Sequence, residues 1–204
     1  MDVCVCPAPA ALTTIPKDDC KENIGQIQKW LFRRYPGAVF AAGAVKLIAN
    51  WTPLFVAANS TKVVVSPFLP NTVIGKPEPV TIGGNDNTTI DGAVVVVGEG
   101  PAEVTGMVRS AKGAIIKAMK QLSCETLEAM FINEFDQMGL DSTDAGVTAT
   151  FFKIDAFYIG SADNKGKNTF DEADYRFSLH ANWRDRLALV TATDFSPKKD
   201  LVIP

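Results

Sequence analysis

The sequence predicts a mainly β protein of the α+β class: a β-sandwich or barrel with one flanking amphipathic helix, an extended N-terminal arm and a long projecting loop. Three observations predict this class. The 204 residues include 19 valines, 13 isoleucines and 16 threonines, and β-branched residues favour strands. Residues 173–184 alternate strictly between apolar and polar side chains, as a strand with one packed face does. Only residues 107–122 show a clear helical period.

The chain is expected to divide into an N-terminal arm, residues 1–22, and a single β-rich domain, residues 23–204. Three prolines, Pro7, Pro9 and Pro16, lie among small residues near the start of the chain. Such a composition is typical of an extended segment rather than of a helix or a strand. No internal repeat and no further domain boundary is visible in the sequence.

The first part of the domain is expected to hold one ambiguous element and two short ones. Residues 24–34 carry a helical stripe but also fit a strand in part, and Tyr35–Gly37 ends the element either way. Thr52 is expected to cap a short helix over residues 53–58, because proline follows it at the first helical position. A β-branched strand over residues 61–66 then stops at a proline.

A long excursion follows, residues 67–91. It contains four prolines and the run Gly-Gly-Asn-Asp-Asn, so we expect an exposed, turn-rich loop that projects from the domain. Loops of this length in compact domains are usually functional or disordered. Residues 93–97 form a wholly apolar strand, which predicts burial on both of its faces.

The second half alternates helix, strands and polar turns. A helix over residues 107–122 would bury one face, made of Val108, Ala111, Ile115, Ala118, Met119 and Leu122. Residues 126–135 and 150–159 are expected to be strands, since both are rich in aromatic and β-branched residues. Residues 186–193 are expected to return as the neighbour of the alternating strand. The intervening polar turns are residues 139–146 and 161–168.

Composition and charge exclude several classes of protein. The chain has 20 basic and 23 acidic residues and a net charge of −3, which argues against sequence-specific binding of duplex DNA. No signal segment and no apolar run long enough to span a bilayer occurs in the sequence. One histidine in the whole chain makes a His-rich metal site impossible.

The cysteines are expected to be free thiols that hold no metal. Three of the four lie in the first twenty residues and the fourth is remote: Cys4, Cys6, Cys20 and Cys124. Zinc sites usually pair Cys-x2-Cys knuckles, and the spacing here is different.

Two loops imitate ligand-binding motifs and fail on their spacing. Gly98-Glu99-Gly100 follows an apolar strand, as in a dinucleotide loop, but the third glycine is replaced by Glu103, which would repel a pyrophosphate. Residues 163–174 have the length and acidic ends of a calcium loop. Position three is Lys165 and position six is Asn168, where an oxygen ligand and a glycine are needed.

Two further groups are interpreted as structural. His180 shares the polar face of its strand with Ser178 and Asn182, but no nucleophile motif surrounds it. Lys112, Lys117 and Lys120 are interpreted as a solvated helix face. We therefore expect no catalytic, cofactor-binding or metal-binding residue, no cofactor and no enzymatic activity.

Four stretches resemble the major tail tube proteins of long-tailed bacteriophages, in style rather than by a diagnostic motif. They are residues 23–29 (NIGQIQK), 60–67 (STKVVVSP), 121–125 (QLSCE) and 174–179 (DYRFSL), the last with the downstream Asp194-Phe195. The resemblance implies a virion structural protein that assembles into rings, six subunits to a ring. Stacked rings would form the tail tube, a conduit through which DNA passes without specific binding.

The resemblance also implies partners and a location. The chain would bind copies of itself, with the arm lying on a neighbouring subunit. It would contact the tape-measure protein and other tail proteins, and no membrane. It would be assembled in the host cytoplasm and reside in the virion tail. Three alternatives remain at this point: a head–tail connector, a capsid decoration protein and a carbohydrate-binding β-sandwich.

Overall fold

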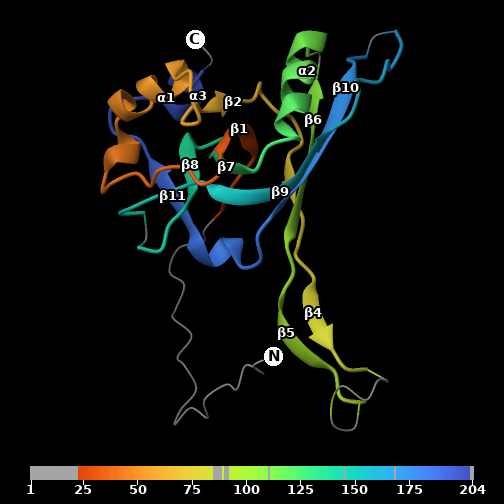
Figure 1. Cartoon of the computed structure of the whole chain (residues 1–204). Coiled ribbons are helices and arrows are strands. Elements are labelled where there is room, and N and C mark those ends of the chain that lie inside the picture. The colour runs from red at the N-terminus through yellow and green to blue at the C-terminus, as the bar shows by residue number, and fades with distance from the viewer. Residues whose placement is uncertain are drawn as a thin grey trace. The chain divides into compact units, whose positions relative to one another are not determined.

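The computed structural model describes residues 23–84, 89, 92–109, 111–144, 146–167 and 169–202, so the predicted arm lies outside the described residues. The fold is mainly β and its strand pairs are antiparallel, which confirms the predicted class (Figure 1). The chain divides into two compact units. In the described residues, one unit is residue 23 with a hairpin over residues 79–98, and the other comprises residues 24–78 and 99–202.

The larger unit holds a sheet that forks at its central strand, β7 (Leu127–Asn133). Along one edge β7 pairs with β1 throughout its length. Its other edge pairs first with β9, at residues 127–129, and then with β8, at residues 131–132. The remaining pairs are β9–β10, β10–β6, β6–β3, β8–β11 and β1–β2. The bounds are β1 Ile27–Arg34, β2 Val64–Val65, β3 Val73–Ile74, β6 Ala102–Arg109, β8 Gln137–Asp141, β9 Phe152–Ile159, β10 Glu172–Leu179 and β11 Leu187–Thr191.

Strands β1 and β7 form a wall between two apolar cores. Trp30 and Phe131 face the first core, whereas Leu31 and Met130 face the second. Both strands are therefore buried on both faces, and neither shows the polar alternation of a half-exposed strand. This explains why residues 24–34 fit both a helical and a strand pattern: the structure resolves the ambiguity in favour of a strand.

Aromatic rings fill both cores. In the first, the Trp30 ring meets the Phe177 ring edge-on, with centroids 4.9 Å apart. In the second, the Phe40 and Trp51 rings lie 4.8 Å apart. Edge-to-face and offset ring pairs at these distances add stability beyond the area that they bury.

The flanking helix, α2 (Gly113–Leu122), starts later than predicted, and its buried face overlaps the predicted one only in part. Residues 107–109 belong to β6, because they pair with β10. The buried side chains are Ile116 and Met119, whereas Ile115 and Ala118 are exposed. The predicted face was therefore right at Met119, and at Ala111 and Leu122, which pack against the same core, and wrong at Ile115 and Ala118. The error arose because the prediction merged strand residues with helix residues.

The short helices contribute to both cores: Trp183 belongs to the first, whereas Val45 and Phe55 belong to the second. Helix α1 (Thr52–Val56) has Pro53 in its first turn, as predicted, but its N-cap is Trp51 and no side chain caps it. The Thr52 hydroxyl instead donates to the carbonyl of Ile48. Helix α3 is Pro197–Asp200, and 3₁₀ turns occupy Ala44–Lys46, Ile48–Asn50 and Trp183–Arg186.

Strand β10 confirms the alternation but not its predicted length or partner. Its core face is Ala173, Tyr175, Phe177 and Leu179, all almost fully buried. The strand ends at Leu179, and the chain then turns into the 3₁₀ helix that contains Trp183. Strand β11 pairs with β8 rather than with β10, whose two neighbours are β6 and β9. The predicted pairing was wrong because the 3₁₀ turn carries the chain to the other branch of the sheet.

Candidate assembly surface

The first candidate for a functional surface is a two-stranded hairpin made of β4 (Pro79–Ile82) and β5 (Val95–Glu99). The excursion predicted as a loop therefore contains strand structure, β3 and β4. Near the tip of the hairpin the Gly84 amide donates to the carbonyl of Gly92, at 3.2 Å. Gly83 adopts a φ of 90°, and a Cβ there would lie 2.2 Å from the carbonyl oxygen of Ala93. A glycine is therefore required at this turn.

The hairpin exposes apolar side chains on both of its strands. The exposed fractions are 46% for Val80, 47% for Ile82, 63% for Val94, 46% for Val95, 64% for Val96 and 53% for Val97. The prediction that residues 93–97 are buried on both faces was wrong: all five are exposed, because the two strands of a ribbon do not cover each other's faces. Contiguous exposed apolar residues of this kind mark an interaction site rather than ordinary surface.

A second candidate is a cavity of about 400 Å³ whose lining includes Glu128, the carboxylate of a buried ion pair with Arg33. The Arg33 guanidinium donates to Glu128 and, at 2.9 Å, to the hydroxyl of Thr150. It also lies over the Phe151 ring, 4.3 Å from the ring centroid. Burial raises the pKa of Glu128 and lowers that of Arg33.

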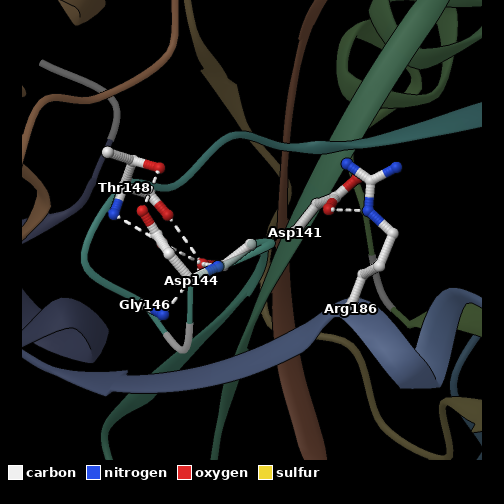
Figure 2. Close-up of polar contacts among 6 residues, drawn as sticks. Asp141, Asp144, Gly146, Thr148 and Arg186 are labelled. Carbon is white, nitrogen blue, oxygen red and sulfur yellow. Dashed lines mark hydrogen bonds and ion pairs between the residues drawn. The ribbon is translucent and has the colours of Figure 1, made fainter.

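The other charged groups that line this cavity also have partners. Asp141 lies 2.7 Å from Arg186 Nε (Figure 2). Burial raises the pKa of Asp141, and the Arg186 charge opposes that shift. His180 lies 3.4 Å from a carboxylate oxygen of Asp155. The ion pairs Arg33–Glu128 and Asp141–Arg186 link strands β1 and β7 to each other and β8 to the 3₁₀ helix Trp183–Arg186.

The loop after β8 is closed by one carboxylate. Asp144 accepts hydrogen bonds from the amide and the hydroxyl of Thr148, at 2.8 and 2.7 Å, and from the hydroxyl of Ser142, at 2.8 Å (Figure 2). The Gly146 amide donates to the same serine hydroxyl. These donors lower the pKa of Asp144. The predicted polar turn, residues 139–146, is therefore partly strand β8 and partly this closed loop.

The motif imitations fall within strands and turns. Gly98 and Glu99 are the last two residues of β5, Gly100 follows the strand, and β6 begins at Ala102, so the segment is the end of a strand and part of the short link to the next. Asp163 forms an isolated β-bridge with Glu172, and Asp174 lies inside β10, which is not the geometry of a calcium loop. Among the described residues no cluster of three metal-ligating side chains occurs.

The remaining predicted positions are placed as follows. Cys124 is an exposed free thiol, and the other three cysteines lie outside the described residues. Lys112, Lys117 and Lys120 are exposed, and the Lys120 amine donates to the hydroxyl of Ser161 at 2.9 Å.

Sequence reasoning missed two buried cations. Besides Arg33, Lys29 is buried in β1, and its amine donates to the carbonyl of Lys198 at 2.6 Å and to that of Leu201 at 3.4 Å. Burial lowers the pKa of Lys29. The available signal was a charged residue within an otherwise apolar strand, such as Lys29 or Glu128. Burying a charge without a partner is costly, so such a residue indicates a buried partner.

Comparisons with known proteins complete the description. No helix in the described part of the chain is both long and apolar enough to cross a membrane. No protein-family model and no curated protein matches the chain. Among solved structures, a chain of one described as "Virion of native gene transfer agent (GTA) particle" matches with a TM-score of 0.34 and 14% identity. The match covers 60% of this chain and 85% of that chain.

Proposed function

We propose that this chain is a virion structural protein that self-assembles into stacked rings of six subunits and so forms the tube of a phage tail. In this role it is no enzyme and needs no cofactor. Its partners are copies of itself, the tape-measure protein and other tail proteins. DNA passes through the tube without being bound specifically.

One observation carries the self-assembly part of this proposal: β5 has the composition of a buried strand and yet is exposed. Four consecutive valines, residues 94–97, are each about half exposed or more. Fully burying a valine stabilises by roughly 1.5–3 kcal/mol. Six half-exposed residues of this kind on the hairpin therefore leave about 5–9 kcal/mol of gross apolar stabilisation available to a partner.

The paired charges of the interior support a structural role. Two carboxylates that line the 400 Å³ cavity, Glu128 and Asp141, are each held by an ion pair, with Arg33 and Arg186 respectively. The resemblance of four sequence stretches to tail tube proteins is the reason for proposing a tail tube in particular, with six subunits in each ring.

The test is the assembly state of the full chain. Sedimentation velocity over a concentration series, followed by negative-stain microscopy, is expected to give rings or tubes. A protein that stays monomeric at every accessible concentration, with no rings on the grid, would refute the proposal. Discs that do not stack would instead favour a connector or a decoration protein.

A variant that lacks residues 1–22 separates assembly from folding. The two apolar cores are built from residues 27–201. The truncated chain is therefore expected to keep its circular dichroism spectrum and to lose polymerisation. Tubes formed by the truncated chain would show that the arm takes no part in assembly.

A further inference from the structure

Charge is segregated between two neighbouring stretches of the chain. Residues 77–108, which include the hairpin, hold five carboxylates and no cation. Residues 109–124, which include α2, hold four cations and no carboxylate. An alternating mixture of signs is the usual pattern for a surface that stays solvated, so this separation requires an explanation.

Two carboxylates that flank the hairpin, Glu78 and Glu99, form no ion pair with any residue that the structure describes. Glu78 directly precedes β4 and Glu99 ends β5. Lys112, the N-cap residue of α2, and Lys117, within the helix, are likewise exposed and form no ion pair with any described residue. The other two cations of the basic stretch are engaged: Arg109 with Glu172, and Lys120 with a serine hydroxyl.

The outer face of α2 is apolar between its lysines. Ile115 is 37% exposed, and Ala114 and Ala118 are exposed on the side away from the buried Ile116 and Met119. Residues three and four apart share one side of a helix. Lys117 therefore lies beside Ala114, and the face offers apolar contact framed by positive charge.

We propose that the acidic, apolar hairpin of one copy of this chain docks on the basic outer face of α2 of another copy. The inference rests on the proposed self-assembly and names the surface that receives the hairpin. The two surfaces differ and are complementary, with carboxylates and valines on one, and lysines with Ile115 on the other. A contact between different surfaces is head-to-tail, and it generates a ring if its rotation closes and a filament if it does not.

A nucleic acid is the competing occupant of the basic face. A phosphate backbone is held by a track of Lys and Arg, whereas two free lysines flank apolar side chains here. Apolar side chains between charges suit a protein partner, whose interface core excludes water. The hairpin supplies the acidic groups that this face lacks, together with valines that can pack on its apolar side chains.

The test uses charge reversal on the full chain. One variant carries Glu78→Lys with Glu99→Lys, and the other carries Lys112→Glu with Lys117→Glu. Each alone places like charges across the contact, so its association should weaken about tenfold or more at low salt. Mixed in equal amounts, the two variants restore opposite charges at every contact, and the mixture should assemble as the wild type does. The control Lys62→Glu with Lys167→Glu makes the same change in net charge as the helix variant, at exposed lysines elsewhere, and it should assemble normally.

Each outcome decides the matter. Monomeric single variants together with an assembling mixture support the proposed contact. Variants that assemble as the wild type does would overturn it and leave self-assembly itself standing. A helix variant that assembles normally but loses binding to duplex DNA would assign α2 to nucleic acid instead. A wild type that never assembles would overturn both this contact and the proposed function.

Discussion

Replacing Val96 by threonine is expected to weaken self-association without lowering the stability of the folded chain. Val96 is 64% exposed, so the folded monomer gains little from it. Threonine has nearly the same shape and also favours strands. Surface substitutions of this kind usually change the free energy of unfolding by less than about 0.5 kcal/mol. The melting temperature should therefore stay close to that of the wild type.

The cost to assembly follows from what the contact would bury. Full burial of a valine is worth roughly 1.5–3 kcal/mol, and about two thirds of that remains to be gained at Val96. Threonine gives up part of this gain and brings a hydroxyl whose burial without a partner costs about 1–3 kcal/mol. A net loss of about 2 kcal/mol weakens each contact roughly thirtyfold.

Sedimentation velocity over a concentration series measures the effect, and thermal melting followed by circular dichroism measures the stability. Val39→Thr is the matched control, because Val39 is 62% exposed and lies outside the hairpin. It should change neither quantity. The reasoning fails if Val96→Thr assembles at wild-type concentrations, or if it melts well below the wild type, since that result would mean that Val96 is buried in the monomer.

Three further predictions concern the fold. Gly139→Ala should lower the free energy of unfolding by about 1–3 kcal/mol in chemical denaturation, because its Cβ would overlap a fully buried aromatic ring on the facing strand; Gly98→Ala, with open space around it, should change little. Arg33→Met should cost about 3–5 kcal/mol by leaving Glu128 buried without its partner, and adding Glu128→Leu should recover most of the loss; an Arg33→Met variant as stable as the wild type would show that the pair contributes nothing. Because hydrogen bonds lower the pKa of Asp144 in the folded state, its contribution is complete above the unfolded carboxyl pKa, about 4, and is lost as pH falls through the lower folded value; the difference in melting temperature between wild type and Asp144→Asn should shrink toward about pH 2, and a constant difference would contradict this.

The fold could be predicted from the sequence where a strand has one buried face and one solvent-exposed face. Strand β10 is the clearest case, since its alternation identified all four core residues. Its neighbours could not be identified in the same way, because strand pairing depends on residues far apart in the chain. The true partners, β6 and β9, differ from the expected β11.

Strands that are buried on both faces lack this alternation of apolar and polar residues, so their secondary structure could not be predicted from it. Strand β1 lies between two cores, so its apolar residues follow neither period, and only the structure distinguishes strand from helix. The boundary between β6 and α2 was lost for a related reason. Val108 belongs to the strand and Met119 to the helix, but both are apolar, and together they imitate one continuous stripe.

The hairpin is the one place where sequence and structure disagree in a way that points to function. The valine run, residues 94–97, has the composition of a strand buried on both faces, and the fold of one chain leaves it exposed. Elsewhere the same composition is buried: β7 is apolar at most of its positions and has no exposed residue.

A long exposed apolar edge is an aggregation hazard that soluble chains usually blunt with charges, prolines or bulges. In this hairpin the only proline of the two strands, Pro79, stands at the first position of β4, and the acidic residues flank the valines rather than interrupt them. An edge left open but bordered by charge of one sign favours a specific partner over indiscriminate association, because the charge rejects a second hairpin and admits a basic surface. The burial that the valines predict would then be reached between chains rather than within one.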